Sequence, residues 1–113
     1  GEIFIPKTPS FKITDLAKII APNASHEVIG IRPGEKLHEQ MISIEDALLT
    51  YEYDNHFKIL PVINNWGSDE HRIQDGKKVE EGFVYSSETN SDWMSEEEVK
   101  SWINLNISNL GAI

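Results

Sequence analysis

The chain has 113 residues and a formal net charge of −9, from 10 basic and 19 acidic residues. This length fits one domain, which is small for an enzyme that needs both a cofactor site and a substrate site. The acidic balance repels phosphate backbones and therefore disfavours nucleic acid and anionic membranes as partners. Because the sequence has no cysteine, only short apolar stretches and no opening signal segment, we expect a cytoplasmic protein without disulfides, thiolate metal sites or a membrane span.

The first third of the sequence alternates between strand-like and helix-like patterns. Residues 2–5 are β-rich and predict a short strand that Pro6 ends. Apolar residues then recur at helical spacing and predict a helix over residues 12–21. They are Ile13, Leu16, Ala17 and Ile20. Residues 27–31 contain three β-branched side chains and predict a second strand, and the Pro-Gly pair after it predicts a turn over residues 32–36.

The middle of the sequence gives a mixed signal. Residues 37–42 fit a helical turn and a strand equally poorly, so no element is predicted there. Ser43 and Asp46 have the form of a capping box with aspartate in place of glutamate, which predicts a short helix. The expected face of that helix continues through Ala47, Leu48 and Tyr51. Residues 57–63 predict a strand at the edge of a sheet, because Pro61 cannot donate a hydrogen bond to a neighbouring strand.

The last third begins with a polar stretch and ends with a well-marked helix. Residues 64–82 have few apolar anchors and predict a long excursion or a hairpin. Residues 83–86 resume a strand. Ser95 and Glu98 form a full capping box and predict the start of the last helix. Its buried face is expected to contain Val99, Trp102 and Ile103, with Met94 packed against Val99 as a hydrophobic staple.

Alternating strands and helices in a chain of this size predict an α/β fold, with α+β as the alternative, built as one small mixed-sheet domain over residues 1–113. The tail carries more apolar surface than an isolated end needs, at Leu105, Ile107 and Leu110. We therefore expect self-association into a homo-oligomer through the terminal helix or the first strand.

Several catalytic and cofactor motifs are missing from the sequence. The seven glycines form neither a dinucleotide-binding loop nor a P-loop, and no tyrosine is followed by a lysine four residues later. His38 and Glu39 begin like a zinc-protease motif, but Ile42 stands where the second histidine is needed. The sequence thus predicts no catalytic residue, no cofactor-binding residue and no metal ligand in this chain.

The strongest candidate site is the turn after the second predicted strand. The guanidinium of Arg32 can hold a diphosphate through two parallel hydrogen bonds, and the carboxylate of Glu35 can accept from a pair of ribose hydroxyls. Spacing alone leaves an alternative open, which is an exposed turn with a weak Arg–Glu ion pair.

Long blocks of the sequence resemble a known family over essentially the whole chain. They are EIFIPK at residues 2–7, DLAK at 15–18, GIRPGEKLHEQMIS at 30–43, TYEYDNHFKILP at 50–61 and YSSETN at 85–90. These blocks closely resemble the C-terminal part of the inverting UDP-N-acetylglucosamine 4,6-dehydratases. The resemblance implies a substrate-binding domain of an extended short-chain dehydrogenase that lacks the Rossmann half, from an enzyme of bacterial surface-glycan or pseudaminic-type nonulosonic-acid biosynthesis.

The resemblance also implies roles for individual residues. Arg32 and Glu35 match the pair that binds the diphosphate and ribose of a UDP-sugar. Lys36, His38 and Glu39 either support the same pocket or orient its loop. NADP and the catalytic groups belong to the missing N-terminal nucleotide-binding half, so the chain alone is expected to be inactive.

Two further alternatives stay open. The aromatic residues Tyr51, Tyr53 and Phe57 are either a wall of the pocket or part of the core. The whole chain is either a portion of a dehydratase or a non-catalytic binding or assembly module that retains the scaffold.

Overall fold

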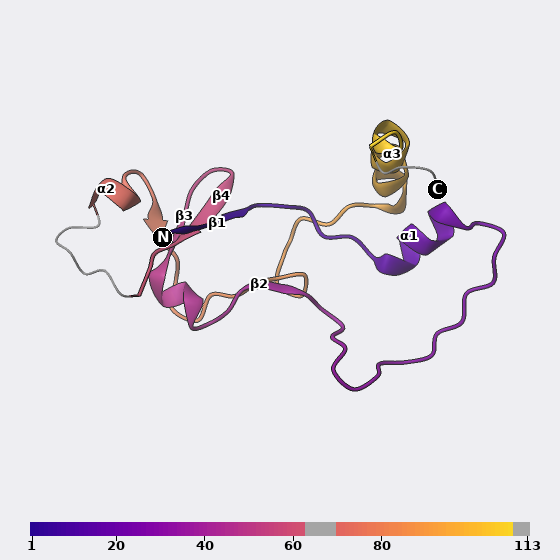
Figure 1. The fold of residues 1–113 in the computed structure, drawn as a ribbon, viewed down its shortest axis with the longest axis horizontal. Coiled ribbons are helices and arrows are strands. Elements are labelled where there is room, and N and C mark those ends of the chain that lie inside the picture. The colour runs from indigo at the N-terminus through magenta and orange to yellow at the C-terminus, as the bar shows by residue number, and fades with distance from the viewer. Residues whose placement is uncertain (63–69, 110–113) are drawn as a thin grey trace. The chain divides into compact units, whose positions relative to one another are not determined.

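The computed structural model describes residues 1–62 and 70–109. The chain divides into two compact units. Unit 1 contains Gly1–Thr8 and His38–Thr89, and unit 2 contains Pro9–Leu37 and Asn90–Ile113. The mixture of helices and strands that the sequence predicts is confirmed, with two small sheets and several short helices (Figure 1).

The main sheet of unit 1 has four strands in the order β1-β4-β3-β5, and all neighbouring strands are antiparallel. The strands are β1 (Ile3–Pro6), β3 (Thr50–Glu52), β4 (His56–Ile59) and β5 (Lys77–Lys78). The predicted first strand is therefore confirmed. In the register of β1 with β4, Ile5 lies opposite Phe57, so two apolar side chains face the core from neighbouring strands.

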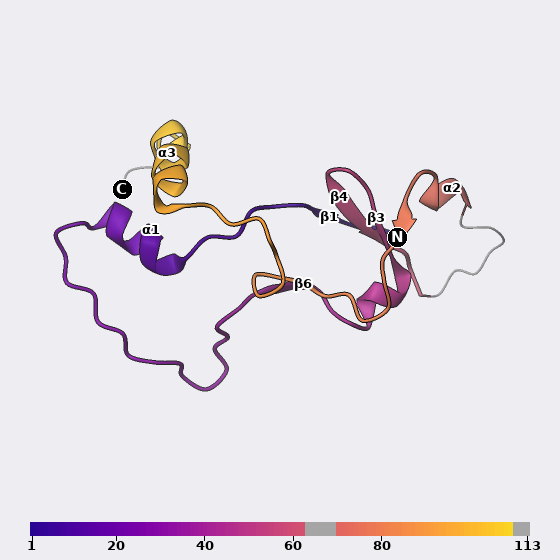
Figure 2. The same ribbon diagram turned by 180° about the vertical axis from the view of Figure 1, so that it is seen from behind.

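A second, two-stranded antiparallel sheet joins β2 (Gln40–Ile42) to β6 (Tyr85–Ser86), which are labelled in Figures 1 and 2 respectively. Residues 40–42, for which the sequence predicts no element, thus form a strand because β6 provides a partner. The 3-10 helix η1 (Asp46–Leu49) connects β2 to β3.

The core of unit 1 forms on the alternate residues of its strands. In β4, Phe57 and Ile59 are buried, whereas His56 and Lys58 are half-buried. The full buried cluster is Ile5, Ile42, Ala47, Phe57, Ile59 and Val79. The ring of Phe57 packs in tilted contact with the rings of Phe83 and Tyr85, at centroid distances of 5.4 and 5.0 Å. Phe57 is therefore a core residue.

Two predictions for the middle of the chain are wrong in part. The predicted edge strand is an inner strand, because β4 lies between β1 and β3 and ends before Pro61, whose missing donor is then outside the ladder. Tyr51 belongs to β3 rather than to the short helix. The helix stops because Thr50 is already extended, and the buried hydroxyl of Thr50 donates to the carbonyl oxygen of Asp46 at 2.7 Å.

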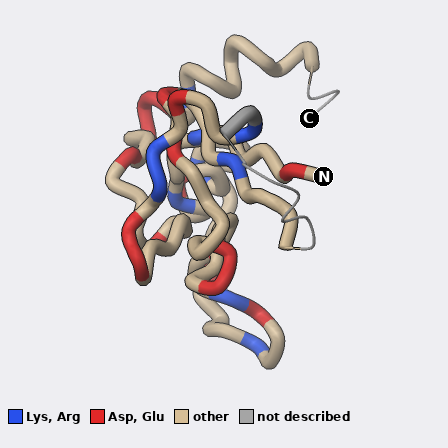
Figure 3. Tube along the Cα trace, turned by 90° about the vertical axis from the view of Figure 1, so that its left-hand side faces the viewer, with Lys and Arg blue, Asp and Glu red and all other residues tan. Residues whose placement is uncertain are grey.

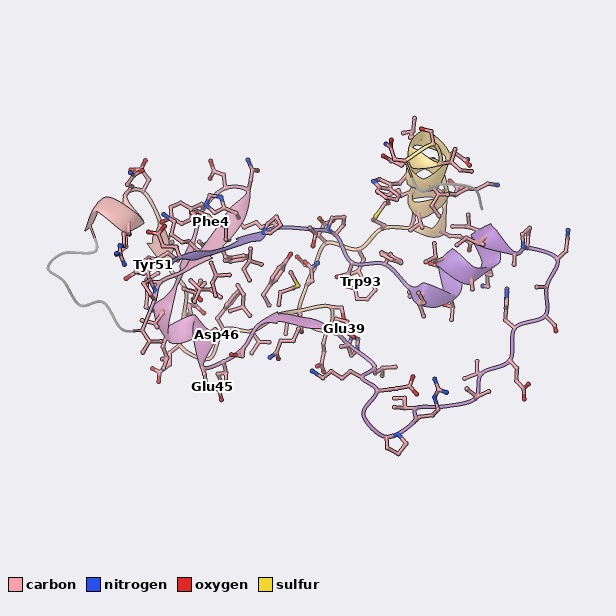
Figure 4. The ribbon with its side chains drawn as sticks, viewed as in Figure 1. Phe4, Glu39, Glu45, Asp46, Tyr51 and Trp93 are labelled. Atoms are coloured by element: carbon pink, nitrogen blue, oxygen red, sulfur yellow. The ribbon has the colours of Figure 1, made fainter. Side chains whose placement is uncertain are left out.

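The reciprocal bonds predicted between Ser43 and Asp46 are present just before η1, although the helix N-cap is Glu45, whose own side chain makes no capping bond. The Ser43 hydroxyl accepts from the N–H of Asp46 at 3.1 Å, and a carboxylate oxygen of Asp46 accepts from the N–H of Ser43 at 3.5 Å (Figure 4 labels Asp46). At the other end, the Lys78 ammonium donates to the carbonyl oxygens of Ala47 and Leu48. Burial lowers the pKa of Lys78. Side chains of the same unit thus contact this short helix from Ser43 before it and from Lys78 on β5.

Unit 2 contains the two longest helices, α1 (Ile13–Ile20) and α3 (Glu96–Asn106), which contact each other. Both confirm the predicted helices. The hydroxyl of Ser95 accepts from the N–H of Glu98, and the Glu98 carboxylate accepts from the N–H of Ser95, each at 3.2 Å. This reciprocal capping satisfies two backbone donors that the helix itself leaves free.

The second predicted strand, over residues 27–31, is wrong for the chain as it stands. These residues belong to no helix or strand, and their apolar side chains are exposed. Gly30 has a φ of +84°, a left-handed conformation that interrupts a strand. Within the described part of the chain no strand pairs with this segment, so its backbone forms no strand-to-strand hydrogen bonds despite its β-rich composition.

The polar excursion predicted over residues 64–82 is described only from residue 70 onward. There the helix α2 (Glu70–Ile73) precedes β5, which pairs with β3. The start of the excursion and Leu110 of the tail lie outside the described residues.

Candidate functional site

The turn that carries the candidate site is built by Pro33 and Gly34. The N–H of Glu35 donates to the carbonyl oxygen of Arg32 at 3.0 Å, which closes a four-residue turn. Gly34 has a φ of +87° at the third position, and proline at the second position fixes its own φ near the value that a type II turn needs. The Pro-Gly pair thus confirms the predicted turn and sets the geometry of the two charged residues at its ends.

Arg32 and Glu35 contact each other across this turn. The Glu35 oxygen Oε1 accepts from Arg32 Nε at 2.7 Å and from the Arg32 backbone N–H at 3.0 Å. The hydrogen bonds from the Arg32 side chain and backbone hold the pKa of Glu35 below its ordinary value. Both side chains remain open to solvent, with exposed fractions of 73% for Arg32 and 46% for Glu35. The ion pair orients the two groups rather than burying them.

The pair keeps binding capacity on the side that faces solvent. Among the described residues, no hydrogen bond engages the two Nη atoms of Arg32 or the Oε2 atom of Glu35. A guanidinium with free Nη donors can bind phosphate oxygens, and a carboxylate with a free oxygen can accept from a hydroxyl. The turn therefore presents a phosphate-type donor and a hydroxyl-type acceptor side by side.

The overall charge does not decide whether this turn attracts an anion. Acidic residues are spread over many segments of both units, as the red positions in Figure 3 show, and do not form a single block. Lys36 follows Glu35 directly and is exposed. A phosphate group near the turn would therefore meet local cations, although the chain as a whole is acidic.

His38 and Glu39 lie in unit 1, next to β2 (Figure 4 labels Glu39), whereas Arg32, Glu35 and Lys36 belong to unit 2. A serine that the site prediction missed connects the first two. The Oγ atom of Ser87 lies 2.9 Å from His38 Nδ1 and accepts from the N–H of Glu39 at 3.2 Å. The Ser87 N–H donates to the Glu39 carbonyl oxygen at 2.9 Å.

This arrangement orients the imidazole of His38. When the Ser87 hydroxyl donates to Nδ1, the ring proton of neutral His38 is at Nε2, which then serves as a donor. Ser87 lies in the YSSETN block, but neither its spacing from His38 nor its residue type signals the contact. Only the pairing of β2 with β6 brings the two segments together.

A polar cavity of about 600 Å³ lies at the β3–β4 end of unit 1. Lys7 and Glu52 form an ion pair of 2.7 Å at its wall, and the rings of Tyr53 and His56 stack at 4.6 Å. Its remaining lining residues are Asp54, Asn55, Asp75 and Lys77. Tyr53 is thus a cavity-lining residue, although this cavity contains none of the predicted site residues.

An apolar groove of about 630 Å³ runs along unit 2. It is lined by Pro9, Phe11, Leu16, Ile20, Met94, Val99, Trp102 and Ile103. The face predicted to be buried on the last helix is therefore only partly covered, since Val99 and Ile103 are buried and Trp102 is exposed. Self-association through the last helix or the first strand stays a prediction, which light scattering of the chain at high concentration would test.

Two classes of site are not seen in the described part of the chain. The ranges 1–62 and 70–109 contain no cluster of three or more histidine, aspartate or glutamate side chains arranged to hold a metal ion. The helices formed by those same residues are all too short or too polar to cross a membrane.

Comparison with known families identifies the chain. A family profile described as "Polysaccharide biosynthesis protein" matches residues 1–61, which are more than half of the 113 residues. The chain belongs to this polysaccharide biosynthesis family. The matched range includes the candidate turn with Arg32 and Glu35.

Named proteins similar to the chain agree with the resemblance that the sequence blocks indicate. Two proteins of Campylobacter jejuni strains, both named UDP-N-acetylglucosamine 4,6-dehydratase (inverting), are 53% and 51% identical to the chain over 109 residues. The matches cover 92% of this chain and 33% of each relative, so the chain spans about a third of their length. The X-ray structure of Pen from Bacillus thuringiensis matches with a TM-score of 0.69 and 26% identity, over 96% of this chain and 32% of Pen.

Proposed function

We propose that this chain is the sugar-nucleotide-binding portion of an inverting UDP-N-acetylglucosamine 4,6-dehydratase and is not catalytic alone. The proposal rests on one observation: over 92% of its length, the chain is 53% and 51% identical in sequence to two proteins of that name. Because the chain spans a third of their length, the proposal assigns the chemistry to the rest of a longer polypeptide. The parent enzyme is proposed to act in the cytoplasm, in bacterial surface-glycan or nonulosonic-acid biosynthesis.

Arg32 and Glu35 are the proposed contacts to the UDP part of the substrate. The free Nη donors of Arg32 suit the diphosphate, and the free Oε2 of Glu35 suits the ribose hydroxyls. The geometry of the ion pair supports this assignment, because Arg32 contacts Glu35 through Nε and not through its Nη donors.

NADP is proposed as the cofactor of the parent enzyme, where it supplies hydride transfer to and from the sugar. The residues of this chain do not fit it. The sequence contains no glycine-rich dinucleotide loop and no tyrosine-lysine pair of the short-chain dehydrogenase type. The proposal therefore places no catalytic step on these residues and limits their role to holding the nucleotide end of the substrate.

The test uses a chimera in which this chain replaces the matching third of the Campylobacter jejuni relative. Losing one hydrogen bond to a charged group costs about 1.5–3 kcal/mol, which corresponds to roughly a 10- to 100-fold increase in KM. We expect Arg32→Ala and Glu35→Gln each to raise the KM for UDP-N-acetylglucosamine by such a factor, with a smaller change in kcat.

Lys100→Ala is the matched control, because Lys100 is an exposed cation on α3 of the same unit. It should leave KM unchanged. A KM that is unaltered in both Arg32→Ala and Glu35→Gln would contradict the proposed binding role. A reading frame that starts just before Gly1 would favour the alternative, a free-standing binding or assembly module.

A further inference from the structure

Residues 27–31 have the composition of a strand but are exposed. Val28, Ile29 and Ile31 have exposed fractions of 89, 72 and 60%. Water-exposed β-branched side chains in a row are unfavourable in a free surface and are typical of a segment that is covered by a partner. The segment also belongs to no helix or strand of the described residues.

The pattern along this segment defines two faces. In an extended strand, alternate side chains point to opposite sides, so Ile29 and Ile31 would share one face, and Val28, Gly30 and Arg32 the other. The present conformation breaks this alternation at Gly30, whose φ is +84°. Glycine can return to the extended region without a steric penalty, so the interruption is reversible.

We infer that residues 27–31 become a β-strand by pairing with a strand in the part of the dehydratase polypeptide that this chain lacks. The inference rests on the proposed function in taking the chain as one portion of that enzyme. About two thirds of each Campylobacter jejuni relative lies outside the matched region, which provides the length for such a partner. Backbone pairing would satisfy the open N–H and C=O groups, and packing would cover Ile29 and Ile31.

Pairing has a direct consequence for the candidate site. Arg32 immediately follows the segment and would be held at the strand end, on the face opposite to the two isoleucines. In the chain alone, the contacts seen for Arg32 among the described residues are those to Glu35, three residues away. The partner strand would thus set the direction of the guanidinium relative to the remainder of the enzyme and complete the diphosphate site.

Amide hydrogen exchange tests the inference in the same chimera. The amides of residues 28–31 should exchange at unprotected rates in the chain alone and about 100-fold or more slowly in the chimera. Ile29→Pro removes one backbone donor from the segment and should abolish the protection of its neighbours and raise the KM for UDP-N-acetylglucosamine at least about tenfold. Ser25→Pro is the control just outside the segment and should alter neither the amide protection of residues 28–31 nor the KM.

Equal exchange rates in the chimera and the chain alone would overturn the inference. Protection in the chain alone that rises with its concentration would also overturn it, because the partner would then be a second copy. The comparison between the unsubstituted proteins decides the matter even if Ile29→Pro fails to fold. If the amides are protected in the chimera but Arg32→Ala leaves the KM for UDP-N-acetylglucosamine unchanged, the proposed binding role is rejected and the strand pairing stands.

Discussion

Replacing Phe57 by leucine tests whether this ring stabilises the fold or forms a ligand pocket. The side chain is 4% exposed and makes tilted contacts with Phe83 and Tyr85. Each aromatic pair contributes about 0.5–1.5 kcal/mol beyond the apolar area that it buries. Leucine keeps most of the apolar volume but loses both ring contacts, so we expect Phe57→Leu to lower the free energy of unfolding by about 2 kcal/mol.

Phe4→Leu is the matched control for this substitution. Phe4 also lies in the main sheet, but its ring is 59% exposed and contacts His56 at a centroid distance of 5.8 Å. Phe4→Leu should lower the free energy of unfolding by less than about 1 kcal/mol. Urea unfolding followed by far-ultraviolet circular dichroism measures both variants. The core assignment is refuted if Phe57→Leu costs no more than Phe4→Leu, particularly if it weakens UDP-sugar binding in the chimera.

Three smaller predictions concern caps and charges. Ser95→Ala removes the N-cap of α3 and should cost about 1 kcal/mol, with faster amide exchange in the first turn of that helix. The pKa of Glu35 is lowered by Arg32, so the contribution of this pair is present above the ordinary carboxyl pKa of 4.5 and is lost as the pH falls through the lowered value. In a carbon-13 titration, Arg32→Ala should return the Glu35 midpoint toward 4.5, and a midpoint that does not move would show that Arg32 is not the cause. Ser87→Ala should change the nitrogen-15 shifts of the His38 ring, whereas Ser87→Thr, which keeps the hydroxyl, should preserve them.

The helices and turns of this chain follow from local chemistry. Ser95 and Glu98 cap α3 through bonds between residues three apart, and the Pro-Gly pair forms the turn of Arg32 and Glu35 in the same way. Such features are encoded within a few residues, so the sequence predicts them without knowledge of the fold. The ion pair of the candidate site belongs to this class, because its two residues share one turn.

Strand pairing depends on partners that are distant in the sequence. Residues 40–42 form a strand because β6 is available, although their own pattern is ambiguous, and residues 27–31 do not form one, although their pattern is clear. The contact of Ser87 with His38 depends on the same pairing of β2 with β6. A strand needs hydrogen-bond partners on a second segment, and no local signal specifies which segment that is.

The sequence by itself determined the family resemblance, the two longest helices, the turn with Arg32 and Glu35, and the absence of a dinucleotide loop, since each depends on residue types at short spacing. The tertiary structure alone decided that β4 is an inner strand, that Phe57 is a core residue, and that residues 27–31 have no strand partner among the described residues. These outcomes depend on which surfaces meet in space, and burial and pairing between distant segments set them.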